Sequence, residues 1–140
     1  MSDVLLASDQ GTSSSRAMAF SPAGEILASE QQPFEAIYPA SGWVEHDAEV
    51  IWATVLSTTR AVLEQLRRSR HAVAAIGITN QRETTVVWDR RTGAPIHNAI
   101  VWQDRRTADR CRELAAAGLE AELAAKTGLR LDPYFSATKL

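Results

Sequence analysis

The sequence predicts an α/β fold in which a three-stranded antiparallel meander is followed by a helix and then by parallel strands. Three observations predict it: three short strand-like runs follow one another closely, one long amphipathic stretch comes next, and an uninterrupted apolar run follows that stretch. Strands joined by short turns pair antiparallel, whereas a strand reached through a helix pairs in parallel. The order of the elements therefore fixes the predicted topology.

The meander is predicted at residues 4–7, 17–20 and 25–29, each a short run rich in apolar residues. Pro22 and Gly24 supply the turn between the second and third runs. Three strands in immediate succession leave room only for tight connections, so we expect neighbouring strands to pair directly.

A helix of about twenty residues is predicted after the meander. Asp47 is a good N-cap, and one face of the helix is marked by Ile51, Val55, Val62 and Leu66. The helix is expected to end near residue 68.

Residues 73–78 are apolar on both faces, as is typical of a central parallel strand. Shorter strands are predicted at residues 84–88 and 100–102, with a turn at residues 91–93 between them.

Beyond Thr107 the composition becomes rich in alanine and leucine, which predicts two helical pieces, broken near Gly118 and stopped by Gly128. Strand, strand, strand, helix, strand is the opening order of the ribonuclease H-like fold, which actin, hexokinase and sugar-kinase domains share. The likeness concerns the fold alone, so function has to be derived from the sites.

The composition of the chain disfavours some kinds of binding partner and some cellular compartments. A chain of 140 residues with 45% hydrophobic residues is typical of one globular domain or part of a larger one, and its net charge of −2 disfavours a general affinity for nucleic acid. The longest apolar run, residues 72–78, is far shorter than the roughly 18 residues that cross a bilayer, so no membrane insertion is expected. Cys111 is the single cysteine, which excludes an internal disulfide and favours a reducing compartment, the cytoplasm.

The connection between the first two strands concentrates groups that suit phosphate. Gly11 allows a sharp turn, and the hydroxyls and amides after it present several donors to one small volume. Asp9, at the end of the first strand, is suited to hold the water shell of Mg²⁺. The candidate phosphate ligands are Thr12, Ser13, Ser14 and Arg16. A plain polar β-turn is the alternative explanation.

Polar side chains also follow the strand predicted at residues 73–78, at the edge where open α/β sheets bind ligands. Arg82 supplies donors beside the acceptor Glu83, so the pair suits two neighbouring hydroxyls of a polyol. On local evidence alone, an exposed ion pair without a function is the better explanation.

Two aromatic residues complete the candidate polyol site. Trp102, between a strand and a helix, offers an indole face to the carbon side of a small polyol, although core packing is the commoner role of such a residue. A turn at Asp132 and Pro133 presents Tyr134, whose hydroxyl suits a ligand and whose ring suits packing.

Other chemistries lack support in the sequence. The histidines show no metal-ligand spacing, and no serine lies in a Gly-x-Ser-x-Gly elbow. A nuclease of the ribonuclease H type needs several carboxylates to hold two metals, whereas Asp9 stands nearly alone.

Five stretches resemble the N-terminal third of glycerol kinases, in the FGGY family of carbohydrate kinases: DQGTSSSRA, GWVEHDAEVIW, AAIGITNQRETTVVWD, NAIVWQDRRTA and TGLRLDPYFSATK. The first would suit any FGGY kinase. The blocks GITNQRETTVVW and GWVEHD are specific to glycerol kinases, and they decide the expected substrate.

The resemblance implies an ATP-dependent transfer of the γ-phosphoryl group to the 3-hydroxyl of glycerol, giving sn-glycerol 3-phosphate and ADP with Mg²⁺ as cofactor. Asp9 matches the family's aspartate associated with the metal and the phosphates, and is thus the candidate catalytic and metal residue of this chain. Residues 12, 13, 14 and 16 match contacts to nucleotide phosphates. The glycerol-binding positions are matched by Arg82, Glu83, Trp102 and Tyr134.

The same resemblance implies that residues 1–140 are an N-terminal piece, because the family's catalytic aspartate and adenosine pocket lie beyond them. We expect this piece to belong to the kinase N-terminal domain, to be inactive alone, and to come from a homo-oligomer. The phosphate turn and the Arg82–Glu83 corner are expected to face each other across one crevice. A kinase of another small polyol or a pentulose, and a non-catalytic polyol-binding fragment, are the alternatives.

Overall fold

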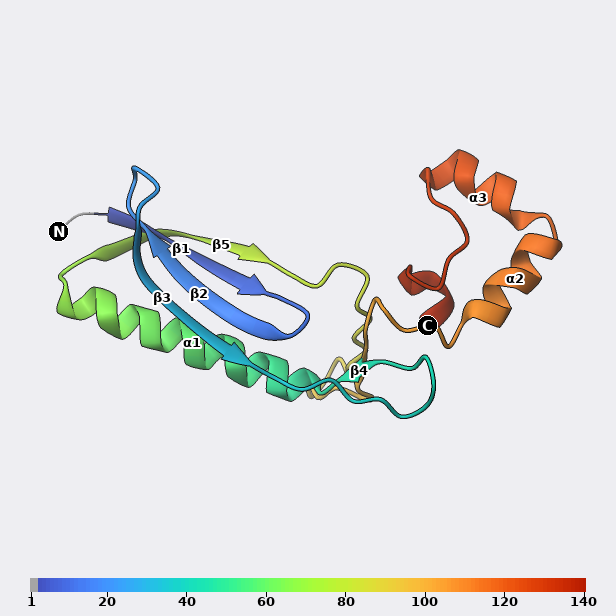
Figure 1. The fold of residues 1–140 in the computed structure, drawn as a ribbon, viewed down its shortest axis with the longest axis horizontal. Coiled ribbons are helices and arrows are strands. Elements are labelled where there is room, and N and C mark those ends of the chain that lie inside the picture. Colours follow the sequence, from blue (N-terminus) through green and yellow to red (C-terminus); the bar gives the residue numbers. More distant parts are fainter. Residues whose placement is uncertain (1–2) are drawn as a thin grey trace. The chain divides into compact units, whose positions relative to one another are not determined.

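The computed structural model describes residues 3–140, which form two compact units. Unit 1 comprises the residues up to Glu35 together with Ala48–Gln81, and unit 2 comprises Ala36–Asp47 and Arg82–Leu140. Figure 1 shows a sheet with one long helix in unit 1, and loops with short strands and helices in unit 2. Each unit buries side chains of its own.

Unit 1 is built on a four-stranded sheet in the order β3-β2-β1-β5. β1 (Asp3–Gln10), β2 (Ser14–Phe20) and β3 (Ile26–Pro33) are antiparallel neighbours, while β5 (Ala72–Thr79) runs parallel to β1. The helix α1 (Ala48–Arg68) precedes β5 in the chain. The predicted meander, helix and following parallel strand are therefore confirmed.

The core of unit 1 lies between α1 and one face of the sheet (Figure 1). The buried positions of α1 are four residues apart: Thr54, Thr58, Val62 and Leu66. Against them pack alternate residues of the strands: Val4, Leu6, Ala17, Ala19 and Ala28. Every fourth residue of the helix therefore packs against every second residue of the strands, as the side-chain periods of the two elements require. Of the helix face predicted from the sequence, the last two residues are buried and the first two are half-buried.

The prediction that residues 73–78 are buried on both faces is wrong. The sequence predicts a strand buried on both faces, yet the exposed fractions of Ile76 and Ile78 are 61% and 79%. β5 is an edge strand of this sheet, and α1 packs against β1, β2 and β3 instead. The strand and its parallel pairing were predicted correctly, but the burial of both its faces was not.

Unit 2 contains two short helices, α2 (Ala108–Ala116) and α3 (Leu119–Thr127), and the 3-10 helix η1 (Ser136–Lys139). Gly118 and Gly128 flank α3 with φ angles of 83° and 74°, a left-handed conformation that favours glycine. The predicted helix break and stop are thus confirmed. Among residues 3–140, no helix has the length and apolar character needed to cross a membrane.

The strands of unit 2 are shorter than predicted. β4 (Glu45–His46) pairs antiparallel with β6 (Ala99–Ile100), so the strand expected at residues 100–102 ends before Trp102. The strand expected at residues 84–88 is wrong: Thr85 bridges Ile100 and Trp88 bridges Pro95, so the segment splits between two partners and forms no ladder.

A buried network of charges holds unit 2 together. Arg106 Nη2 donates to Glu45 Oε1 at 2.7 Å and to Asp104 Oδ2 at 2.9 Å, and the exposed fractions of the three side chains are 13%, 5% and 0%. Asp104 also accepts the backbone N–H of Val44 at 2.6 Å. The Arg106 guanidinium lies 4.0 Å from the centre of the Trp43 ring. The segment before β4 and the loop after β6 are therefore joined through one guanidinium.

The network shifts the protonation of its members. Burial alone would raise the pKa of the Asp104 and Glu45 carboxyls, but hydrogen bonds from Arg106 and neighbouring donors outweigh it, so both pKa values lie below the ordinary one. Burial lowers the pKa of His46, the neighbour of Glu45 in β4. The folded state thus favours ionised carboxylates and a neutral imidazole.

Candidate functional site

The candidate phosphate turn, residues 11–14, joins β1 to β2. The Gly11 N–H donates to the Ser14 carbonyl at 3.0 Å, and a Cβ added to Gly11 would lie 3.0 Å from that same oxygen. The side-chain amides of Gln10 and Gln81 donate to the Gly11 carbonyl at 2.8 Å and 2.9 Å. The turn is therefore closed tightly at a glycine and held by amides from the ends of β1 and β5.

Ser15, the fourth hydroxyl of this stretch, belongs to the core and not to a ligand surface. It is 1% exposed, because β2 alternates and places it with Ala17 on the α1 side. Its Oγ hydrogen-bonds Thr54 Oγ1 of α1 and Gln10 Oε1, each at 2.8 Å. Ser15 fastens the turn to the helix.

Ser14 and Arg16 lie on the opposite face of β2, where Gln31 of β3 orients both. The Gln31 amide donates to Ser14 Oγ at 2.8 Å and accepts from Arg16 Nη2 at 2.9 Å. Ser13 is exposed at the tip of the turn, and Thr12 is half-buried beside it. The end of the sheet thus carries hydroxyl donors and one guanidinium, a combination that suits the binding of an anion.

Asp9 belongs to the same face as Arg16. The β1–β2 register pairs Asp9 with Arg16, and the β1–β5 register pairs it with Thr79. Because paired residues share a face, the Asp9 carboxylate projects from the side of the sheet opposite to α1. Among the described residues, no group of three or more histidines, cysteines or acidic side chains surrounds a metal site. Asp9 can therefore supply one carboxylate ligand beside the turn.

All four predicted polyol residues belong to unit 2, and three of them, Glu83, Trp102 and Tyr134, are here called the acceptor cluster. The Trp102 and Tyr134 rings meet edge to face with centroids 5.7 Å apart. The backbone N–H of Trp102 donates to Oγ1 of Thr84 at 3.3 Å, and Thr84 follows Glu83 in the chain. Arg82 is exposed in the turn before Glu83. Two aromatic rings from separate loops are thus in contact, and a hydrogen bond joins the Trp102 backbone to the residue that follows Glu83.

The turn that presents Tyr134 follows the prediction. Asp132 Oδ1 accepts the Tyr134 N–H at 2.8 Å and pairs with Arg105 Nη1 at 3.2 Å. The Phe135 ring packs at 87° against Tyr134 with centroids 5.0 Å apart. Tyr134 is half-buried, so its ring is held between two aromatic neighbours.

The phosphate turn belongs to unit 1 and the acceptor cluster to unit 2. Each has chemistry that suits the ligand expected from the sequence: donors for phosphate in one, and an acceptor with aromatic rings for a polyol in the other. That the two face each other across one crevice stays a prediction.

Comparison with known proteins gives the family. The model of the N-terminal domain of FGGY carbohydrate kinases matches residues 4–140. This chain belongs to the FGGY family of carbohydrate kinases. The match runs through both units and includes every residue of the phosphate turn and the acceptor cluster.

Similar FGGY proteins include curated glycerol kinases. The chain is 62% identical over 138 residues to a glycerol kinase of Ralstonia nicotianae, covering 99% of this chain and 28% of that protein. It is 61% identical over 140 residues to glycerol kinase 1 of Pseudomonas aeruginosa, covering 100% and 28%. The chain therefore spans about 28% of the length of these relatives.

Solved FGGY structures share the fold. The Plasmodium falciparum glycerol kinase with ADP superposes with a TM-score of 0.91 at 34% identity, covering 99% of this chain and 28% of that one. A xylulose kinase from Rhodospirillum rubrum gives a TM-score of 0.90 at 24% identity, with coverage of 97% and 28%. The second likeness concerns the fold alone.

Sequence reasoning missed three residues that contact the candidate site residues: Gln31, Ser136 and Lys139. The register of β2 and β3 places Gln31 opposite Arg16, and such pairing could have been inferred once both strands were aligned. The other contacts join residues far apart in the chain, and no local pattern signals them.

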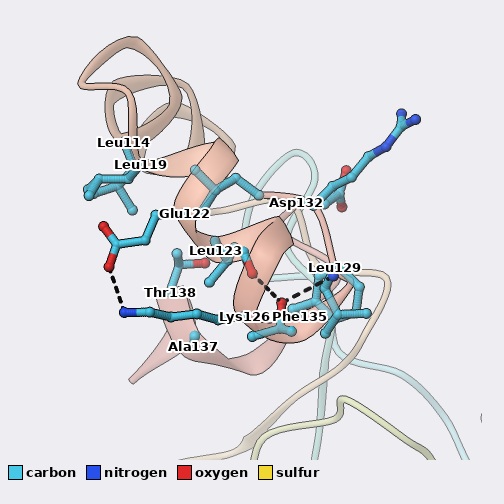
Figure 2. A pocket seen from close by; sticks show the side chains of 13 residues that line it. Leu114, Leu119, Glu122, Leu123, Lys126, Leu129, Asp132, Phe135, Ala137 and Thr138 are labelled. Carbon is cyan, nitrogen blue, oxygen red and sulfur yellow. Dashed lines mark hydrogen bonds and ion pairs between the residues drawn. The ribbon is translucent and has the colours of Figure 1, made fainter.

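A groove in unit 2 is a separate feature from the acceptor cluster. It has a volume of about 510 Å³ and is lined by residues of α2, α3, η1 and the segment between α3 and η1. Figure 2 shows mainly aliphatic side chains around it, including Leu119, Leu123 and Leu129, with the Lys126–Glu122 ion pair among them. Its walls carry little of the polar chemistry that a polyol needs, so it is no candidate for the acceptor site.

Proposed function

We propose that this chain is the N-terminal part of a glycerol kinase, which transfers the γ-phosphoryl group of ATP to the 3-hydroxyl of glycerol and releases ADP. The observation that carries the proposal is the acceptor cluster. Glu83, Trp102 and Tyr134 come from three loops of unit 2, the two rings are in contact, and the resemblance to glycerol kinases assigns all three residues to glycerol. The identity of about 60% to curated glycerol kinases supports glycerol over another polyol.

The acceptor cluster suits a small triol on physical grounds. A hydroxyl both donates and accepts, so the Glu83 carboxylate accepts from one hydroxyl while the Arg82 guanidinium donates to another. The Trp102 and Tyr134 rings offer apolar surface to the carbon chain. The two rings contact each other edge to face, so together they form one apolar surface for the carbon chain of a small polyol.

The phosphate turn suits the nucleotide. Thr12, Ser13, Ser14 and Arg16 supply donors for phosphate oxygens, and Asp9 supplies a carboxylate on the same face as Arg16. Mg²⁺ commonly binds through one or two carboxylates together with substrate phosphates, and a single carboxylate beside the turn fits this pattern. When bound, the ion neutralises charge on the phosphates, and the residues of the chain position them.

The test is a substrate panel with the whole protein, coupled to ADP release. We expect turnover with ATP and glycerol and much weaker turnover with pentuloses or other polyols. Preferred turnover of a pentulose would favour a kinase of another substrate, and glycerol binding without any transfer would favour a non-catalytic polyol-binding protein.

We further propose that the protein is cytoplasmic, because Cys111 is a lone thiol and a reducing compartment suits it. Light scattering of the whole protein tests the homo-oligomer expected from the resemblance.

Arg82→Ala probes the acceptor site directly. Loss of a charged donor to a glycerol hydroxyl weakens glycerol binding by about 1–3 kcal/mol, which is roughly a 5- to 150-fold rise in the glycerol KM. The matched control is Arg110→Ala, since Arg110 is an exposed arginine of unit 2 that pairs with Glu113. An unchanged glycerol KM in Arg82→Ala would remove Arg82 from the site.

A further inference from the structure

Glu83 has an unusual backbone. Its φ angle is 65°, in the left-handed region that non-glycine residues rarely adopt. Such a conformation persists only where the surrounding structure holds it, and it occurs often at ligand-binding positions. The question is which contacts hold Glu83 in it.

Ser136 contacts both the backbone and the carboxylate of Glu83. Its Oγ lies 3.2 Å from the Glu83 carbonyl oxygen and 3.1 Å from Oε2, and its backbone N–H donates to Oε2 at 3.3 Å. The two residues are 53 positions apart in the chain. One serine, the first residue of η1, thus fixes the left-handed turn and the direction of its side chain.

We propose that Ser136 is a positioning residue for glycerol: by holding Oε2 of Glu83 it presents the other carboxylate oxygen, Oε1, to an acceptor hydroxyl. The inference rests on the proposed function. Among the hydrogen bonds of the described chain, those of Glu83 use Oε2 and the carbonyl oxygen, so Oε1 is the oxygen left to accept from a ligand.

The same short helix fixes the other two members of the acceptor cluster. Lys139, at the end of η1, donates through Nζ to the Val101 carbonyl at 3.0 Å and to the Tyr134 carbonyl at 3.4 Å. Val101 precedes Trp102 in the chain, so one ammonium ties the segments that carry both rings. η1 therefore joins the Glu83 turn, the Trp102 loop and the Tyr134 turn, and Ser136 is its contact to the charged member.

The experiment compares Ser136→Ala, Ser136→Cys and Ser136→Thr in the whole protein. The alanine variant keeps the backbone N–H but loses the hydroxyl bonds to Glu83, and hydrogen bonds to charged groups are strong, so we expect the glycerol KM to rise about 10-fold. The KM for ATP should stay within about twofold. Threonine keeps the hydroxyl and should restore the glycerol KM, while cysteine keeps the size with a weak donor and should fall between.

A double-mutant cycle separates positioning from general destabilisation. If Ser136 acts through Glu83, adding Ser136→Ala to Glu83→Ala should raise the glycerol KM no further, whereas an independent structural effect would add to it. Ser69→Ala is the control, because Ser69 is an exposed serine at the end of α1 that donates to the Gln65 carbonyl at 2.9 Å. It should change neither KM.

The outcomes divide cleanly. A wild-type protein without glycerol-dependent ADP release contradicts the proposed function itself. An active wild type whose Ser136→Ala variant keeps its glycerol KM within twofold overturns the positioning role and leaves the function standing. Should the alanine variant fail to fold, Ser136→Cys decides in the same way, and equal rises in the KM for glycerol and for ATP also overturn the proposal.

Discussion

Removing the Asp104 carboxylate should destabilise unit 2 strongly. Asp104 is 0% exposed and accepts four hydrogen bonds, one from the Val44 N–H and three from the backbone and guanidinium of Arg106, at 2.6–2.9 Å. In Asp104→Ala these donors lose their acceptor, while Glu45 keeps one bond to the guanidinium at 2.7 Å. Breaking a buried ion pair costs about 3–5 kcal/mol, a large part of the 5–15 kcal/mol that usually stabilises a domain.

The assay is urea denaturation followed by tryptophan fluorescence, with amide hydrogen exchange at Val44 and Arg106 as the local readout. Asp104→Asn retains one oxygen acceptor and should lose less stability than Asp104→Ala. Asp109→Ala is the matched control, because Asp109 is an exposed aspartate of α2 that pairs with Arg112 one turn away. Equal effects of the Asp104 and Asp109 substitutions, or unchanged exchange at Val44, would refute the reasoning.

Three further predictions concern the protonation of His46, the protonation of the buried carboxylates, and the metal. Burial lowers the pKa of His46 from its ordinary 6.5, so the unfolded chain binds a proton there that the folded chain resists. The urea midpoint should therefore fall as the pH drops below about 6.5, and His46→Gln should flatten that part of the profile. Because the pKa values of Asp104 and Glu45 are lowered in the folded state, these carboxylates stabilise the protein at pH values above the ordinary carboxyl pKa. That stability is lost as the pH falls through their folded pKa values. The urea midpoint of Asp104→Asn should therefore fall less than that of the wild type over this acid range. In the whole protein at saturating Mg²⁺, Asp9→Asn should lower kcat more than it raises the glycerol KM, and the reverse pattern would remove Asp9 from the metal and phosphate role.

The fold of unit 1 could be predicted because each of its elements carries a local signal. Short apolar runs in β1 and β2, turn residues at Pro22 and Gly24, and a long helical period in α1 all agree with the final arrangement. Burial is a different matter, since it depends on what lies beside an element. β5 shows this, because its apolar run indicates a strand but cannot say which neighbours cover Ile76 and Ile78.

The candidate site could be predicted by residue type but not by contact. The sequence places four hydroxyls in one stretch, yet the pleat of β2 sends Ser15 into the core and Ser14 to the other face. A composition argument treats such neighbours as equivalent, whereas a strand separates them. The left-handed backbone of Glu83 was equally invisible, because no glycine or asparagine marks it.

The two units are stabilised by different means, and this bears on where a binding site can be built. Unit 1 buries a continuous set of aliphatic residues between helix and sheet. Among the described residues of unit 2, the buried nonpolar ones are Ala99, Val101, Cys111 and Pro133, and as many polar ones are buried with them: Glu45, His46, Thr85 and Asp104. Loops cannot bury a regular apolar face, so hydrogen bonds to charged groups take over the task of fixing them. Directional bonds of this kind also set the orientation of side chains, which packing alone does less sharply, and a polyol site requires such orientation because each hydroxyl must meet its own partner. In unit 2 such bonds run from Ser136 to Glu83 and from Lys139 to the Val101 and Tyr134 carbonyls, and they orient the segments that carry the acceptor cluster.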